Sequence, residues 1–194
     1  MRIREAESGD EDVISAVHER SVRELAAEHY DDAVVEAWVS PTEDDESSDA
    51  DSSEERADTD DSSVGGGDDV DGVQPEGGRL FVAEVPADEG PAARTVVGFG
   101  DVRFEPPEYL EESADGGVRA VYVDPDHAGE GVGAALLRRL EIEARDEGLE
   151  SLGLLASINA RGFYEYHGYE PLGERTFDFG DGVEGPAVEM RQEF

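Results

Sequence analysis

The sequence contains no Lys, no Cys and no long apolar run, and each absence removes a class of protein. Without Cys there is no disulfide framework, no thiolate metal site and no Cys nucleophile. The four His are scattered without zinc-ligand spacing, so no metal site is expected. No run approaches the ~20 apolar residues of a membrane span, and the N-terminal residues lack the apolar core of a signal peptide. We therefore expect a cytoplasmic protein with no membrane partner.

The charge is strongly one-sided. All 15 basic residues are Arg, against 51 Asp and Glu, and the net charge is -36. A field of this sign repels nucleic acid and anionic membrane surfaces, so neither is an expected partner. At molar salt the Debye length is only about 3 Å, and surface charges then hardly affect one another or an approaching ligand. The composition therefore predicts a halophilic protein.

One acidic segment interrupts the chain. Residues 40–78 are nearly all Asp, Glu, Ser and Gly; they hold 15 acidic residues and one Arg, a net charge of -14, which leaves -22 on the rest of the chain. Such a segment cannot bury enough apolar surface to offset the entropy of ordering. Because 194 residues suit one domain, we expect a single domain over 1–194, interrupted by a disordered acidic insertion at 40–78.

Local patterns predict the order of the secondary structure. Runs rich in β-branched and aromatic residues predict strands over 2–6, 80–85, 95–104, 118–123 and 151–156. Apolar residues at helical spacing predict helices over 10–28, 31–39, 131–147 and 160–166, the first opened by a capping box from Ser8 to Glu11. The tail alternates around Phe177, Phe179, Val188 and Met190. This order predicts an α/β (α+β) fold, with a mixed, mostly antiparallel central sheet and helices on both faces.

The most informative stretch runs from Val118 to Leu137 and reads VRAVYVDPDHAGEGVGAALL. A predicted strand leads into glycines that open a helix. Glycines at alternate positions let the backbone turn tightly and approach a ligand closely, and the first N–H groups of the helix form an anion site. The stretch is suited to binding a pyrophosphate.

Three other interpretations of these glycines compete. A P-loop needs Lys followed by Ser or Thr, and the chain has no Lys. A Rossmann turn needs its first glycine at the strand end and an acidic residue that closes the next strand; here Asp124 to Ala128 intervene, and Glu150 precedes the next strand. The third interpretation is a tight strand-to-helix turn without a ligand.

A second motif, ASINARGFYEYHGY, lies downstream at Ala156 to Tyr169. Together the two motifs resemble the GNAT superfamily of acetyl-CoA-dependent N-acetyltransferases. The signature of that superfamily is a strand, an Arg/Gln-x-x-Gly-x-Gly/Ala turn and helix, a second strand, and a Ser/Asn-x-x-Ala-x-x-Phe-Tyr-x-x-x-Gly-Phe helix. The resemblance spans about 118–172 and implies a GNAT-like fold.

The resemblance also implies how acetyl-CoA would be held. Strands 118–123 and 151–156 would splay apart, so that the pantetheine arm pairs with the exposed backbone of the first strand. Amides of the glycine turn would hold the pyrophosphate. The residues expected to bind the coenzyme are Val121, Tyr122, Val123, Ala128, Gly129, Glu130, Gly131, Val132, Gly133, Ala134, Ser157, Asn159 and Phe163.

Two catalytic groups follow from the same resemblance. The N–H of Val123 would donate to the oxyanion, and the Tyr164 phenol would protonate the departing thiolate. A packing role is the alternative for Tyr164, and helix capping is the alternative for Ser157 and Asn159. The reaction would be direct attack by a primary amine, with a small-molecule amine as the expected acceptor and a protein amine as the second choice.

Several points stay open in the sequence. Ala128 occupies the usual Arg/Gln position of the family, and Glu130 sits where a basic or neutral residue is common. These departures keep an alternative function open, a non-catalytic acyl-CoA-binding sensor or interaction module on the same fold. The general base is open among Glu84, Asp101, Glu105 and a water chain. A homodimer is a further open alternative.

Overall fold

A computed structural model of the chain describes residues 1–40, 74–87, 93–111 and 113–194. Seven strands form one sheet in the order β1-β2-β3-β4-β5-β7-β6. Every neighbouring pair is antiparallel except β4 and β5, which run parallel. The strands are β1 (Arg2–Glu5), β2 (Gly78–Pro86), β3 (Arg94–Arg103), β4 (Gly116–Val123), β5 (Ser151–Ser157), β6 (Glu170–Asp178) and β7 (Glu184–Glu193).

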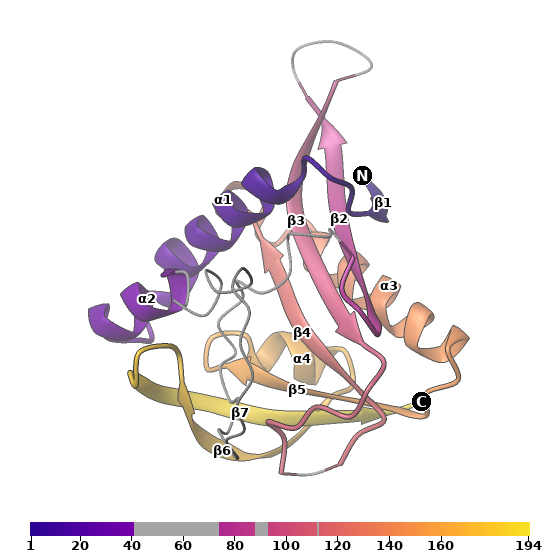
Figure 1. The fold of residues 1–194 in the computed structure, drawn as a ribbon. Helices are drawn as coiled ribbons and strands as arrows, with labels where there is room; N and C mark the ends of the chain where they lie inside the picture. The colour runs from indigo at the N-terminus through magenta and orange to yellow at the C-terminus, as the bar shows by residue number, and fades with distance from the viewer. Residues whose placement is uncertain (41–73, 88–92, 112) are drawn as a thin grey trace, which may run out of the picture.

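Helices cover both faces of the sheet, as the sequence predicts (Figure 1). One face carries α1 (Glu11–Ser21), the π-helical turn η1 (Val22–Ala26) and α2 (Asp32–Val39), and the other carries α3 (Val132–Asp146) and α4 (Arg161–Tyr166). We call the first the α1 face and the second the α3 face. Ile14 and Val17 pack on Phe99 on the α1 face. Leu136 and Leu140, fully buried, pack on Phe81 on the α3 face.

The sheet splits between β4 and β5, also as expected. The two strands pair only at Gly116 with Leu152 and at Gly117 with Gly153. Beyond this vertex β4 continues to Val123 and β5 to Ser157 without pairing. A Cβ on Gly117 would lie 2.5 Å from Pro107 Cγ, so only glycine lets Pro107 pack against the vertex. The gap between the strands is the feature that positions the site.

The first helix differs from the prediction at both ends. The N-cap residue is Asp10, so the capping box expected from Ser8 does not form. Asp10 instead accepts two hydrogen bonds from Arg4, at 2.6 and 2.9 Å, which secure the helix to β1. The predicted continuous helix over 10–28 changes at Val22 into a π turn that ends at Ala26. Such turns are uncommon within helices and are frequent at functional sites.

The predicted acidic insertion falls largely outside the described residues. Gln74, four residues before the predicted end of the insertion, is the first described residue after it. Its side-chain amide donates to the carbonyls of Ala6 and Leu80, at 2.9 and 3.1 Å, and accepts from the Leu80 N–H at 3.0 Å. Residues 74–78 therefore belong to the folded body.

In the part of the chain described here, no helix is long and apolar enough to cross a membrane.

Candidate active site

The glycine turn connects β4 to α3 through a short 3-10 turn, η4 (Pro125–His127). Gly129 and Gly131 have φ angles of +77° and +84°, a backbone region that L side chains rarely adopt. Gly131 is the N-cap of α3, and the first turn of the helix carries no acidic residue. The first N–H groups of α3 lack partners within the helix and point out of its end. The turn therefore presents an anion site.

Glu130 differs from its neighbours in the turn. Its carboxylate lies 2.9 Å from Nδ1 of His127. Its side chain is 60% exposed, so the charge is directed to the solvent and to His127. This geometry limits the repulsion that an acidic residue in the turn would exert on a bound phosphate.

The edge of β4 faces the gap with two backbone donors. The N–H of Asp124 donates to the carbonyl of Val97 on β3, at 2.9 Å. Backbone groups alternate in direction along a strand, so the N–H groups of Val121 and Val123 point away from β3, into the gap. Both residues were predicted to bind the arm of the coenzyme, and Val123 was predicted to donate to the oxyanion. Their position fits both roles.

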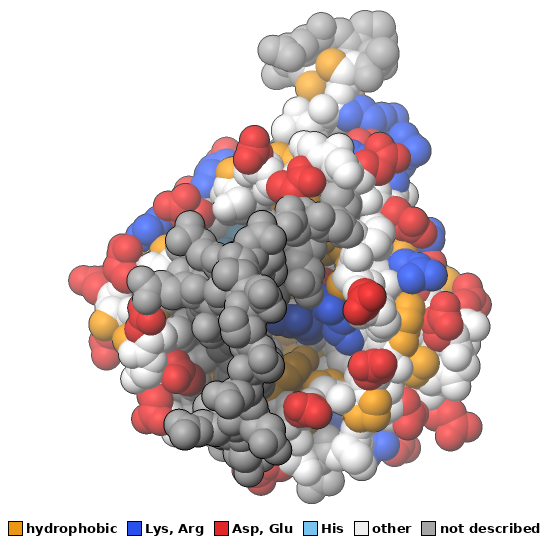
Figure 2. Space-filling model, viewed as in Figure 1, with side chains coloured by type: hydrophobic (Ala, Val, Ile, Leu, Met, Phe, Trp, Pro, Cys, Tyr) orange, Lys and Arg blue, Asp and Glu red, His pale blue; other side chains and the backbone are white. Residues whose placement is uncertain are grey.

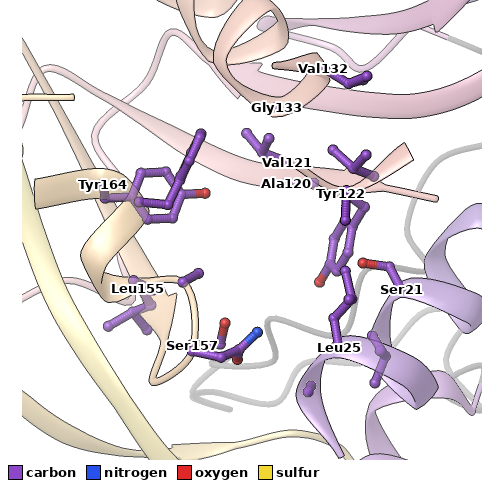
Figure 3. A pocket seen from close by; sticks show the side chains of 18 of the residues that line it. Ser21, Leu25, Ala120, Val121, Tyr122, Val132, Gly133, Leu155, Ser157 and Tyr164 are labelled. Atoms are coloured by element: carbon purple, nitrogen blue, oxygen red, sulfur yellow. The ribbon is translucent and has the colours of Figure 1, made fainter. Parts of the chain in front are cut away.

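Tyr164 lies on α4, directly after β5, and its hydroxyl points into the space beside β4 (Figure 3). Its side chain packs edge-to-face with Phe163, with ring centroids 5.0 Å apart. Burial raises the pKa of Tyr164 above its ordinary value, and nearby Tyr122 adds to this effect. The phenol therefore stays protonated at neutral pH. It packs in the core and also reaches the cavity.

A cavity of about 680 Å³ joins these elements. It passes through the gap, so its wall includes the glycine turn and Tyr164 on one side and η1, Trp38 and Phe179 on the other. All the residues predicted for the site line it except Glu130: they are Val121, Tyr122, Val123, Ala128, Gly129, Gly131, Val132, Gly133, Ala134, Ser157, Asn159, Phe163 and Tyr164. The α4 N-cap is Ala160, with no side-chain cap, so Ser157 and Asn159 do not cap that helix.

Of the residues that form the wall on the α1 face, only Tyr122 was named from the sequence, as a residue expected to bind the coenzyme. Tyr122 projects from β4 to this side, and its hydroxyl accepts a hydrogen bond from Trp38 Nε1 at 3.0 Å. The Tyr122 ring stacks on Phe99 and meets His18 edge-on, with ring centroids 5.2 and 4.6 Å apart. Burial raises the pKa of Tyr122 to about 12 and lowers that of His18 to about 4. Figure 3 shows the hydroxyls of Tyr122 and Tyr164 pointing into the cavity from opposite sides.

The three carboxylates considered as general bases do not line this cavity. Glu84 accepts from Arg4 at 2.7 Å, Asp101 accepts from Arg103 at 3.1 Å, and Glu105 lies on the surface. Among the described residues there is also no group of three or more His, Asp or Glu that could hold a metal ion.

Comparisons with known proteins identify the family and the fold. Residues 76–171 match the family described as the acetyltransferase (GNAT) domain. A GCN5-related N-acetyltransferase from Rhodopseudomonas palustris has a similar structure, with a TM-score of 0.68 and 22% identity, over 100% of this chain and 95% of that chain. The PaiA N-acetyltransferase from Thermoplasma acidophilum, solved with coenzyme A, has a TM-score of 0.64 and 15% identity, over 100% and 98%.

A third similar structure is the ribosomal-protein-alanine N-acetyltransferase from Brucella melitensis, with a TM-score of 0.57 and 19% identity over 100% of both chains. At these identities the structures establish the fold. No curated protein matches the chain. The family match and the fold together show that the chain belongs to the GNAT superfamily and is a GNAT-type N-acetyltransferase. Acetyl-CoA is the acetyl donor of this family.

Proposed function

We propose that the chain transfers the acetyl group of acetyl-CoA to a primary amine by direct attack, with Tyr164 as the general acid. One observation carries the proposal: a single cavity connects the anion site at Gly131, the open edge of β4 and the Tyr164 hydroxyl. The pyrophosphate would lie on the N–H groups of the turn, and the pantetheine arm would run along β4 as an added strand. The acceptor would then enter from the α1 face.

The reaction needs no covalent acyl-enzyme. The neutral amine nitrogen attacks the thioester carbonyl, and the resulting oxyanion accepts a hydrogen bond from a β4 amide that faces the gap, with Val123 as the first candidate and Val121 as the second. The carbon–sulfur bond then breaks. The thiolate takes the Tyr164 proton, and the amine nitrogen loses its own proton. Since no described carboxylate lines the cavity, we assign this last proton transfer to water, and solvent returns a proton to the Tyr164 phenolate.

Thiol release tests the proposal directly. The protein is incubated with acetyl-CoA in about 3 M KCl, where charge repulsion is screened, and free thiol is measured with and without primary amines. We expect amine-dependent thiol release, and acetyl-CoA should also raise the melting temperature by binding the native state. Stabilisation by acetyl-CoA with no thiol release from any amine, including a peptide N-terminus, would favour a sensor and contradict the proposal.

A further inference from the structure

The wall of the cavity on the α1 face is mostly apolar and aromatic. Ser21 is the polar side chain that η1 and the end of α1 contribute to it. The apolar side chains come from separate elements and include Val22, Leu25, Ala26, Leu155, Phe177 and Phe179. A wall of this composition stabilises an apolar body by removing it from water, and it offers few groups that could hydrogen-bond a sugar or a polyol.

A second positive charge on the acceptor would find no carboxylate in the described lining. The chain has 51 acidic residues, and Figure 2 shows acidic side chains on the surface around a hollow in which hydrophobic side chains are visible. None of the described residues that line the cavity is Asp or Glu, and Arg119, which does line it, already has an interaction partner in the fold. A buried ammonium group without a counter-ion is costly. The described lining therefore disfavours polyamines.

A β-bulge turns Tyr122 toward this wall. The pairing of β4 with β3 shifts at Arg119, which is an extra residue of β4. Val118, before the shift, packs in the core of the α3 face, whereas Tyr122, after it, packs on Phe99 on the α1 face. Residues an even number of positions apart lie on the same face of a regular strand. The bulge therefore accounts for the change of face and brings the Tyr122 ring to the acceptor side.

The hydroxyl of Tyr122 is held in place and keeps further hydrogen-bonding capacity. Trp38 Nε1 donates to it at 3.0 Å. An indole N–H can only donate, so the phenol oxygen is the acceptor in this bond, and a phenol oxygen can take part in more than one hydrogen bond. The ring packs against Phe99 and His18, and the hydroxyl points into the cavity (Figure 3). Tyr122 can therefore bind one polar group of a ligand among apolar side chains.

This hydroxyl suits the nitrogen of the acceptor. A neutral primary amine has two N–H donors and one lone pair. When one N–H donates to the Tyr122 oxygen, the lone pair stays available for a thioester carbonyl beside β4, where Val123 is the next residue. Holding the attacking atom near its target in this way raises the rate. Burial raises the pKa of Tyr122 to about 12, so the phenol stays neutral and orients the amine without acting as its base.

We propose that the acceptor is a primary amine on an apolar or aromatic body with no second positive charge, and that the Tyr122 hydroxyl orients its nitrogen. The wall around Leu25 and Phe179 takes the body, and Trp38 holds the hydroxyl. The inference rests on the proposed acetyl transfer and names its substrate class.

Matched amines test the substrate class in the thiol-release assay. The values of kcat/KM are compared for pentylamine and cadaverine, which differ only in a second terminal amino group, and for propylamine, phenethylamine and a peptide N-terminus. We expect pentylamine to be preferred over cadaverine at least about 10-fold, because the diamine buries an unpaired charge. Each methylene group between propylamine and pentylamine should raise kcat/KM roughly fourfold, the scale of burying one such group.

Leu25→Glu places a carboxylate in the wall, and Leu172→Glu is the matched control. Leu25 lines the cavity and is 36% exposed, whereas Leu172 on β6 is 44% exposed and does not line it. Leu25→Glu gives the second ammonium group of cadaverine a counter-ion, so it should reduce the preference for pentylamine by roughly threefold or more. Leu172→Glu should leave the preference unchanged.

Tyr122→Phe tests the orienting hydroxyl, and Tyr30→Phe is its matched control. Tyr30 belongs to the same aromatic cluster, where its ring lies edge-on to Trp38 and its hydroxyl donates to the carbonyl of Pro186 at 2.7 Å, but it does not line the cavity. Tyr122→Phe should lower kcat/KM for pentylamine roughly 10-fold, the scale of one hydrogen bond, and leave the KM for acetyl-CoA unchanged. Tyr30→Phe should leave both values unchanged.

Several outcomes overturn the inference. They are a higher kcat/KM for cadaverine or the peptide N-terminus than for pentylamine, full activity of Tyr122→Phe, and an equal loss in Tyr30→Phe, which would mean that both hydroxyls act through packing. Thiol release with these other amines leaves the proposed function standing and removes this inference alone. If no amine of any class releases thiol, the proposed function fails, and the inference fails with it.

Discussion

The two walls of the cavity are built from different parts of the chain. The wall that we propose holds the coenzyme, called here the coenzyme wall, uses backbone: two glycines with positive φ, the start of α3 and the amides of β4. The wall on the α1 face, which we call the acceptor wall, uses side chains from η1, α2, β4, β5, β7 and β6 with its following turn. A backbone site depends on a few residue types at fixed spacing, whereas a side-chain site can be made from many combinations. The first wall suits a common donor, and the second can differ between relatives.

The largest expected effect is on the chemical step, and it leaves substrate binding at both walls of the cavity unchanged. Tyr164→Phe should lower kcat by roughly 100-fold or more, because it removes the proposed acid, and should leave the KM for acetyl-CoA unchanged. Steady-state kinetics check this. Since burial raises the pKa of Tyr164, its hydroxyl stays protonated up to about pH 9, and kcat should not fall on its account between about pH 7 and 9.

Tyr169→Phe is the control for Tyr164→Phe. Tyr169 is buried, its ring lies 5.6 Å from that of Tyr164, and it does not line the cavity. This variant should keep its kcat. If both variants lose activity equally, Tyr164 acts through packing, and the acid remains to be found.

The second prediction concerns the support of the acceptor wall. His18 backs Tyr122 and has its pKa lowered to about 4 by burial, from 6.5. Below about pH 6.5 the unfolded chain binds a proton at His18 and the folded chain does not, so His18 destabilises the fold as pH falls from 6.5 toward 4. Between about pH 7 and 5 the loss is roughly 2 kcal/mol.

His18→Gln removes this titration. The free energy of unfolding of both proteins is measured with denaturant at the two pH values, in high salt. The protein with His18 should lose roughly 2 kcal/mol more than His18→Gln. An equal loss would mean that His18 becomes charged within the fold.

The third prediction tests the coenzyme wall alone, with two glycines at opposite ends of α3. Gly131 and Gly148 have φ angles of +84° and +88°, and a Cβ would meet nothing within 4 Å at either one. Alanine at either position should therefore lower the free energy of unfolding by a similar amount, about 1 kcal/mol. Only Gly131→Ala adds a methyl group at the anion site. We expect it alone to raise the KM for acetyl-CoA, by roughly tenfold. Equal KM values for the two variants would remove Gly131 from the coenzyme site.

The contrast between a wall built from backbone and a wall built from side chains also explains which features the sequence could predict. The strands and the helix after the glycine turn follow local patterns, because glycine and β-branched residues restrict the backbone within a few positions. The split between β4 and β5 was implied only by the resemblance to the GNAT superfamily, and the roles of the motif residues that line the cavity remain predictions. Trp38, Phe177 and Phe179 also lie in predicted elements, but only the β-sheet order brings them to Tyr122. No periodicity in the sequence predicts that these three side chains pack beside Tyr122.

Two further features escaped prediction for similar reasons. The bulge at Arg119 depends on the register between β3 and β4, which single strands do not reveal. The N-cap at Asp10 depends on Arg4 from β1, so a tertiary contact replaced the local capping box. The prediction of a halophilic protein with a cytoplasmic location remains a prediction, and so does that of a homodimer.

The narrow vertex between β4 and β5 has a mechanical consequence. Two residue pairs hold the halves of the sheet together there, and each half has its own helix, α3 packed on β2, β3 and β4, and α4 beside β5 and β6. The strand pairing between the two halves is therefore short, and one hydrophobic core on the α3 face spans both of them. A ligand that lies in the gap like an added strand would contact the unpaired edges of both β4 and β5. Its binding would therefore make the two halves of the sheet more rigid relative to each other, in addition to occupying the cavity.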